Sequence, residues 1–187
     1  MSEAKLAPIH RSVSVSWKPE AAFRRFTSDF GTWWPTQTHS IGEKRVKRVV
    51  FECREGGSIF EEHLDGRRFA WGRVTLWDPP QRVGFTWHPS RDAATSQDVE
   101  VRFVPESTGT RLELSAQGWE RWGKGASRAR RGYDLGWGYV LNVWADRRTA
   151  RMAAMDGMVV VLRGVQWLRG GVDAAIARAG GAMPPSH

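Results

Sequence analysis

The sequence has 187 residues, a formal net charge of +8 and 11 tryptophans. This length predicts one domain with a substantial core. Cys53 is the single cysteine, which excludes an intrachain disulfide and favours a reducing compartment. Residues 1–10 have no signal-peptide layout, and the longest aliphatic run, 158–162, is too short to span a bilayer. We therefore expect a cytoplasmic protein without a membrane span.

The first part of the chain changes from a strand pattern to helical spacing. Residues 11–16 alternate between apolar and polar side chains, which predicts a half-buried strand. Pro19 suits the first turn of a helix, and Gly31 is expected to end it. Residues 33–35 (Trp-Trp-Pro) predict a second short turn or helix, and 36–44 read as a polar loop.

Six further strands are predicted in quick succession. Turn signals such as Asp65-Gly66 separate them, and loops this short imply that neighbouring strands pair antiparallel. With the first strand the expected sheet has seven strands, one face of which is apolar. The six segments are 46–54, 58–64, 68–77, 82–88, 99–103 and 112–116.

Residues 127–151 predict a long amphipathic helix that covers the apolar face of this sheet, with Ser127 as its N-cap. Helical spacing returns in 158–176, where glycines weaken it; we expect one or two short helices there, or else a dimer or partner surface. The expected organisation is therefore a flexible lead-in (1–10), one domain (11–151) and a C-terminal helical extension with a disordered tail (152–187).

The order of these elements resembles the helix-grip fold of the START/SRPBCC superfamily, the birch-pollen-allergen fold. Several short sequence segments are similar to those of the activator of heat shock protein 90 ATPase homologue family. The segments that carry this resemblance are 30–35 (F-G-T-W-W-P), Glu52 with Gly56-Gly57, Asp65-Gly66, 71–74, 77–82, 85–87, 100–103, Gly109-Thr110 and Gly136-Trp137. The resemblance implies an α+β fold: a seven-stranded antiparallel sheet, two short helices and a long C-terminal helix.

An apolar cavity between sheet and long helix is what the resemblance implies for function. We expect non-catalytic binding of a small apolar or aromatic molecule there, through aromatic rings and one carboxylate. The alternative is that the same rings fill a solid core. The residues expected to line the site are Trp34, Glu52, Phe60, Trp71, Trp87, Phe103, Tyr133, Trp137, Leu141 and Trp144.

Catalytic motifs are not found in the sequence, so no catalytic residue, metal ligand or cofactor is predicted. The densest titratable cluster is Glu61-Glu62-His63, in which Glu61 and His63 share one face of a strand. We expect it to be an exposed polar face, with an acid–base or metal role as the alternative. Glu100 alternates with apolar neighbours, which places it opposite the apolar face.

Positive charge is concentrated in residues 119–187, which carry a net +6. This third of the chain could dock an acidic protein, so a chaperone cofactor or regulator is the second functional hypothesis. A cyclase or hydrolase that uses the cavity is the third. The sequence leaves the oligomeric state open between monomer and homodimer. We interpret the basic side chains around Trp122 as the solvated rim of a loop and not as a nucleic-acid site. These cations are Arg121, Lys124, Arg128, Arg130 and Arg131.

Overall fold

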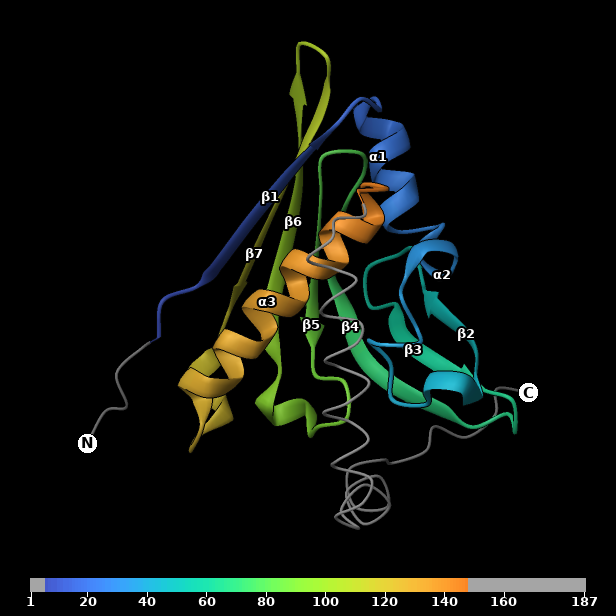
Figure 1. Cartoon of the computed structure of the whole chain (residues 1–187), viewed down its shortest axis with the longest axis vertical. Helices are drawn as coiled ribbons and strands as arrows, with labels where there is room; N and C mark the ends of the chain where they lie inside the picture. Colours follow the sequence, from blue (N-terminus) through green and yellow to red (C-terminus); the bar gives the residue numbers. More distant parts are fainter. Residues whose placement is uncertain (1–5, 148–187) are drawn as a thin grey trace.

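A curved antiparallel sheet wraps around a long helix in the computed structural model, which describes residues 6–147 (Figure 1). This arrangement confirms the expected α+β helix-grip architecture. None of the helices within the described range is long and apolar enough to cross a membrane. The expected extension at 152–187 lies outside the described residues.

The sheet has seven strands in the order β1-β7-β6-β5-β4-β3-β2, and every neighbouring pair is antiparallel. β1 begins two residues before the predicted strand, inside the expected lead-in, and β2 ends three residues before its predicted end. The strands are β1 (Ile9–Val15), β2 (Val46–Phe51), β3 (Ser58–His63), β4 (Arg68–Asp78), β5 (Arg82–Trp87), β6 (Gln97–Glu106) and β7 (Gly109–Gln117).

Two short helices cover one end of the curved sheet. α1 (Pro19–Phe26) starts at its proline, as expected, but it ends at Phe26, and Gly31, which was expected to end it, lies inside α2 (Phe30–Trp33). α2 packs along the edge strand β2 so closely that a Cβ on Gly31 would lie 2.8 Å from the Val49 carbonyl oxygen. The glycine therefore lets a helix cover a strand edge that would otherwise be open to pairing.

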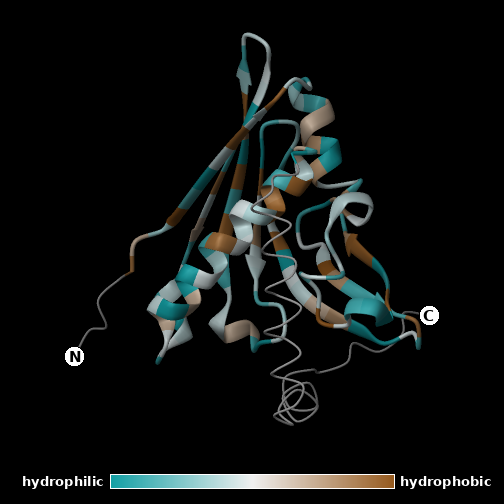
Figure 2. Cartoon of the chain, in the orientation of Figure 1, coloured by the Kyte–Doolittle hydropathy of each residue, from teal (hydrophilic) through white to brown (hydrophobic). Residues whose placement is uncertain are grey.

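The long helix α3 (Ala126–Trp144) crosses the concave side of the sheet (Figure 1). Its N-cap is Gly125 at φ 93°, a left-handed conformation that glycine adopts without strain, so the prediction of Ser127 as N-cap is wrong. The predicted apolar stripe is confirmed, because Trp137, Leu141 and Trp144 are buried against the sheet side. Figure 2 shows hydrophobic positions alternating with hydrophilic ones along α3 and β1, as expected for elements with one buried face.

Polar contacts anchor α3 to α1, to β1 and to the segment before β1. At its C-terminal end Arg25 donates from Nε to the Trp144 carbonyl oxygen (3.0 Å) and pairs with Asp146 (2.7 Å). Near its start Arg130 donates to main-chain carbonyls of the segment before β1, and in its middle Asp134 pairs with Arg11 of β1 (2.9 Å). The helix is thus anchored to α1 and β1 by polar contacts, and Trp137 in its middle packs against the sheet through its ring.

A β-bulge in β4 shapes the sheet where it faces the middle of α3. Ile59 of β3 pairs with Gly72 and Phe60 with Ala70, so Trp71 is an extra residue in the ladder. At Gly72 the neighbouring strand comes so close that a Cβ would lie 1.8 Å from the Thr86 carbonyl oxygen. The bulge directs the Trp71 side chain into the interior, where it is completely buried.

Candidate functional site: a tryptophan layer beside a buried carboxylate

Four tryptophans from four separate elements meet between the sheet and α3, and we call them the tryptophan layer: Trp34, Trp71, Trp87 and Trp137. Trp34 follows α2, and its ring centroid lies 5.2 Å from that of Trp71 and 5.4 Å from that of Trp87. Trp87 ends β5 and lies 5.4 Å from Trp71 and 5.3 Å from Trp137 of α3. All four side chains are buried. Large aromatic surfaces contribute most to the free energy of burial at such a junction.

Two indole N–H groups of the layer donate to fixed acceptors. Trp34 Nε1 donates to the His39 carbonyl oxygen at 2.7 Å. Trp71 Nε1 donates to Glu61 Oε2 at 3.1 Å. The Nε1 atom of Trp137 is buried and has no hydrogen-bond partner among the described residues. The layer therefore presents mainly aromatic surface, together with the buried N–H of Trp137, which has no acceptor within residues 6–147.

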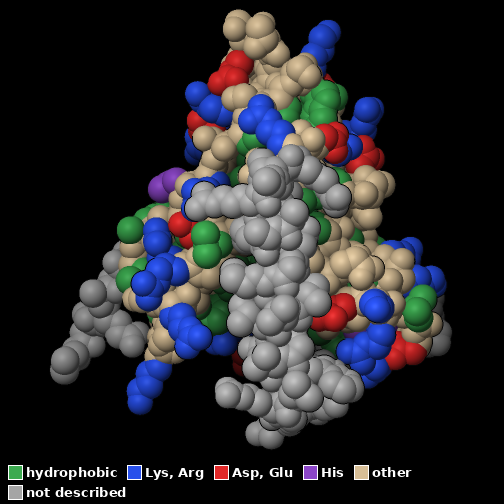
Figure 3. All heavy atoms as spheres, in the orientation of Figure 1, with side chains coloured by type: hydrophobic (Ala, Val, Ile, Leu, Met, Phe, Trp, Pro, Cys, Tyr) green, Lys and Arg blue, Asp and Glu red, His purple; other side chains and the backbone are tan. Residues whose placement is uncertain are grey.

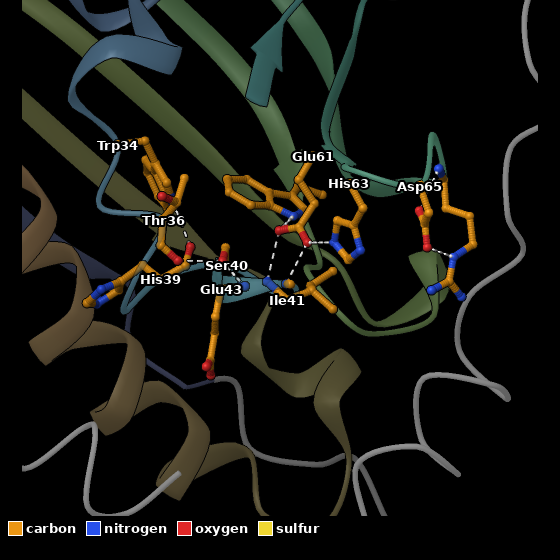
Figure 4. A network of polar contacts seen from close by, with 12 residues as sticks. Trp34, Thr36, His39, Ser40, Ile41, Glu43, Glu61, His63 and Asp65 are labelled. Carbon is orange, nitrogen blue, oxygen red and sulfur yellow. Dashed lines mark hydrogen bonds and ion pairs between the residues drawn. The ribbon is translucent and has the colours of Figure 1, made fainter. Parts of the chain in front are cut away.

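Glu61 lies beside the layer and is completely buried. Its carboxylate accepts from the backbone N–H groups of Ile41 (2.8 Å) and Gly42 (2.7 Å) as well as from Trp71. A carboxylate is an acceptor for all of these donors when it is ionised, and such charge-assisted contacts offset much of the cost of burial. Figure 4 shows this carboxylate between the loop that contains Ile41 and the indole ring beside it.

His63 completes the network from the same face of β3. Its Nε2 lies 2.5 Å from Glu61 Oε1, and its ring packs against Phe69 with 4.4 Å between centroids. Because Oε1 is an acceptor, Nε2 carries the proton, which leaves Nδ1 as an acceptor. Nδ1 is buried without a partner in the described part of the chain. A Cβ on Gly42 would lie 2.2 Å from His63 Nε2, so the loop needs glycine there.

The segment 35–42, here called the crossing loop, joins the network to α3. Its His39 ring stacks on Tyr139 of α3 at 4.7 Å and an interplanar angle of 14°. Thr38 Oγ1 lies 2.8 Å from His39 Nδ1. Ser40 Oγ donates to the Thr36 carbonyl oxygen at 2.5 Å (Figure 4). The loop therefore touches both the helix and the buried carboxylate.

The remaining expected site residues lie at the two ends of α3. At its C-terminal end Trp144 and Phe103 face Phe26, with centroids 6.2 and 5.9 Å from that of Phe26. At its N-terminal end Tyr133 packs between Trp119 and Trp122, and burial raises the pKa of its hydroxyl to about 12. The other expected wall residue on the helix, Leu141, is buried in the common core.

Two expected site residues do not reach the interior. Glu52 lies at the turn after β2, where Oε2 accepts from the Ser58 N–H at 2.8 Å and pairs with Arg54 at 3.2 Å. Its carboxylate shapes that turn, so its placement in the cavity wall is wrong. Phe60 is buried, but on the opposite face of β3 from Glu61 and under the Arg68 guanidinium at 5.1 Å, so it points away from the side of β3 that bears the Glu61 network.

The expectation that residues 61–63 form an exposed polar face is also wrong. Glu62 is the outward member, yet it too is mostly covered, by Lys47 (3.0 Å), Arg48 (2.8 Å) and Arg68 (3.3 Å). The hydrogen bond from Arg48, followed by that from Lys47, lowers the pKa of Glu62 to about 2. Figure 3 shows Lys and Arg side chains gathered at the corner of the molecule that β2 and β3 form.

The basic cluster around Trp122 is partly used inside the fold. Arg121 pairs with Asp98 (2.5 Å) and donates to the Ser96 carbonyl oxygen (2.8 Å). Arg91 lies 3.6 Å over the Trp122 ring. Together with the anchoring of Arg130 to backbone carbonyls, these contacts support the loop-rim interpretation. Much of the basic C-terminal third lies outside the described residues.

Sequence reasoning missed His39, Tyr139 and the amides of the crossing loop, and it misjudged Glu61 and His63. Strand parity offered one signal, because Glu61 and His63 share a face with Ile59, which is a core residue. No local pattern linked residues 41 and 42 to β3. Within the described residues no three His, Cys, Asp or Glu side chains converge as a metal site would require.

The comparisons with known proteins agree with this architecture. Residues 16–143 match the family model described as Activator of Hsp90 ATPase homolog 1-like protein. The chain belongs to this family. The match covers the strands from β2 onward, both short helices and nearly all of α3, so it contains the tryptophan layer and the Glu61 network. A comparison with curated proteins finds no match.

Solved structures similar to this Activator of Hsp90 ATPase homolog 1-like chain share its fold. Protein MLL2253 from Mesorhizobium loti is 18% identical over 75% of this chain and 96% of its own, with a TM-score of 0.53. The AHSA1-like protein from Aeromonas hydrophila is 15% identical over 75% and 91%, with a TM-score of 0.54. A third, described as the anthrahydroquino-Gama-pyrone synthase Txn09, is 34% identical over 70% and 88%, with a TM-score of 0.49.

Proposed function

We propose that the protein binds a planar apolar or aromatic small molecule between α3 and the concave face of the sheet, against the tryptophan layer. The observation that carries this proposal is the convergence of four buried indole rings from four elements at one place. A flat ligand that enters the layer exchanges ring–ring contacts for ring–ligand contacts of the same kind. Such insertion therefore loses little of the packing energy that the layer provides.

The composition of α3 supports insertion at this point. Gly132, Gly136 and Gly138 lie inside the helix, and each weakens an interior helical position by about 1 kcal/mol relative to alanine. Polar contacts anchor the helix at its C-terminal end through Arg25 and at Asp134 through Arg11, whereas Trp137, one turn after Asp134, meets the sheet through its ring. The stretch between Asp134 and Trp144 is therefore the part of α3 that a ligand in the layer would displace.

Ligand-observed saturation-transfer NMR with a panel of planar aromatic compounds tests the proposal. We expect a subset of the panel to bind, to raise the melting temperature and to show contacts with indole N–H protons. Trp87→Leu should abolish binding, whereas Trp122→Leu, outside the layer, should preserve it; circular dichroism would verify that both variants fold. If no planar compound binds, or if both variants bind equally well, the proposal fails.

A second function is favoured by one specific observation, the 2.5 Å contact between Glu61 and His63. A carboxylate that holds an imidazole in one tautomer resembles the base–orienter pair of many proton-transfer enzymes. In such a role His63 Nδ1 would accept a proton from the bound ligand, and Glu61 would stabilise the imidazolium. A cyclase-type reaction is one that needs this step.

The probe 5-nitrobenzisoxazole, a planar aromatic whose ring opens when a base removes its C–H proton, tests this second function. Release of its coloured phenolate above the buffer rate, lost in His63→Gln and retained in His88→Gln, would support an enzyme. A rate of phenolate release equal to that in buffer, or equal rates in both variants, would contradict the enzymatic function.

A further inference from the structure

Four of the buried tryptophans have a paired indole N–H, whereas two on α3 have no acceptor among the described residues. Trp33 Nε1 donates to the Arg25 carbonyl oxygen at 2.7 Å and Trp119 Nε1 to the Ala116 carbonyl oxygen at 2.9 Å. Trp34 and Trp71 donate within the site, as described above. The buried Nε1 atoms of Trp137 and Trp144 have no acceptor among residues 6–147. Buried donors are nearly always paired in native proteins, so these two require an explanation.

The surroundings of these two donors differ. Trp144 is completely buried among the rings of Trp17, Phe26 and Phe103, at the fastened end of α3. Trp137 lies in the tryptophan layer, with its ring 5.3 Å from Trp87 and tilted by 49°. Any molecule that enters the layer meets Trp137, whereas the C-terminal cluster around Trp144 lies two helical turns away.

Acceptors beside the layer are already occupied. The His39 carbonyl oxygen receives the Trp34 N–H, and Glu61 receives the backbone N–H groups of the crossing loop together with Trp71. A ligand in the layer therefore meets aromatic faces and the buried, unpaired N–H of Trp137. A ligand without an acceptor leaves that donor unpaired, and a ligand with a correctly placed oxygen satisfies it.

We infer that the ligand is a planar aromatic ketone or related ring-conjugated oxygen compound, whose oxygen accepts a hydrogen bond from Trp137 Nε1. This inference rests on the proposed function, since it names the ligand class of the same site. The rings select flat molecules of any polarity, and Trp137 adds selection for an oxygen on the ring system. Trp137 is therefore the residue that determines specificity, whereas the other tryptophans of the layer supply contact area.

The test uses a matched pair of soluble probes, 9-fluorenone-2-carboxylate and fluorene-2-carboxylate, which differ only in the ring carbonyl. One hydrogen bond to a buried donor predicts that the ketone binds about tenfold more tightly than the hydrocarbon in calorimetric titration. Trp137→Phe keeps an aromatic ring but removes the donor, so the two probes should then bind equally. Trp144→Phe removes the other unpaired donor and should retain the tenfold preference.

A second readout is the ¹H–¹⁵N spectrum of the indole groups. The ketone, but not the hydrocarbon, should move downfield the one indole signal that Trp137→Phe deletes. Equal affinity of the wild-type protein for both probes, or a preference that survives Trp137→Phe, would overturn the inference while leaving the proposed function intact. If neither probe binds, the proposed function fails for this ligand class, and the inference fails with it.

Discussion

Trp71 donates a hydrogen bond from Nε1 to Glu61 Oε2 at 3.1 Å, and both side chains are completely buried. The contact joins the tryptophan layer to the buried carboxylate. Through that carboxylate it also joins the layer to the crossing loop, whose residues Ile41 and Gly42 donate to the same group. Changes in the polar network should therefore affect the packing of the rings.

Glu61→Gln tests how strongly this network stabilises the fold. The amide keeps the shape of the side chain but turns one acceptor into a donor that faces N–H groups, so we expect a loss of about 2–4 kcal/mol in the free energy of unfolding. Glu113→Gln is the matched control, because Glu113 is half exposed and forms an ion pair with Arg111 at the surface. Urea denaturation measures both, and equal losses would contradict the assigned role of Glu61.

Gly42→Ala tests the contact between the crossing loop and His63. The added methyl group would lie 2.2 Å from Nε2 and 2.6 Å from Cε1 of the His63 ring, so the loop or the ring must move. We expect destabilisation of about 1–3 kcal/mol. Gly132→Ala in α3 meets no atom within 4 Å and should instead stabilise by up to about 1 kcal/mol. Thermal melts that shift both variants in one direction would refute this account.

Arg25→Ala tests the fastening of the C-terminal end of α3. The change removes the donor to the Trp144 carbonyl oxygen, the ion pair with Asp146 and the guanidinium 4.9 Å over the Trp17 ring. We expect a loss of about 1–2 kcal/mol in the free energy of unfolding. Arg24→Ala is the adjacent control: its side chain is mostly exposed, so no more than a few tenths of a kcal/mol should be lost. A control that loses as much as Arg25→Ala would rule out a specific fastening.

The lowered pKa of Glu62 predicts how the free energy of unfolding depends on pH in the acid range. Its pKa is lowered in the folded protein from an ordinary 4.5 to about 2, chiefly by the hydrogen bond from Arg48. Above pH 4.5 the carboxylate is ionised in both states and its ion pairs contribute fully; as the pH falls toward 2 the unfolded state takes up the proton first and the contribution is lost. The stability difference between wild type and Glu62→Gln should therefore shrink from pH 5 to pH 2. A difference that stays constant over this range would show that the ion pairs do not act as described.

The sheet and the long helix were predictable because their patterns are local. Alternation in β5, β6 and β7 gives each strand one apolar face, and the spacing from Trp137 to Trp144 gives α3 a matching stripe. The bulge that turns Trp71 inward was not predictable in this way. It depends on how closely the backbone of β5 at Thr86 approaches Gly72, which is a relation between strands.

The polar part of the site could not be read from the sequence for a related reason. A Glu-Glu-His run is polar on any hydropathy scale, and burial of Glu61 is tolerable only because donors arrive from the crossing loop and from Trp71. These donors are 10 to 20 positions away along the chain. The four tryptophans of the layer were expected to lie together, and their rings do meet, although their role in ligand binding stays a prediction. Glu52 and Phe60 were expected in the same wall, but Glu52 lies at a turn and Phe60 on the face of β3 opposite Glu61.

The two adjacent carboxylates of β3 also act as a check on strand pairing. A slip of one residue would carry Glu62 into the interior, away from Lys47, Arg48 and Arg68, and would leave the loop amides and the indole of Trp71 facing a different side chain. Both ionised groups would lose their partners in a single step. The misaligned hairpin is thus penalised twice, and neighbouring negative charges that look redundant in the sequence make the correct alignment of the strand the favoured one.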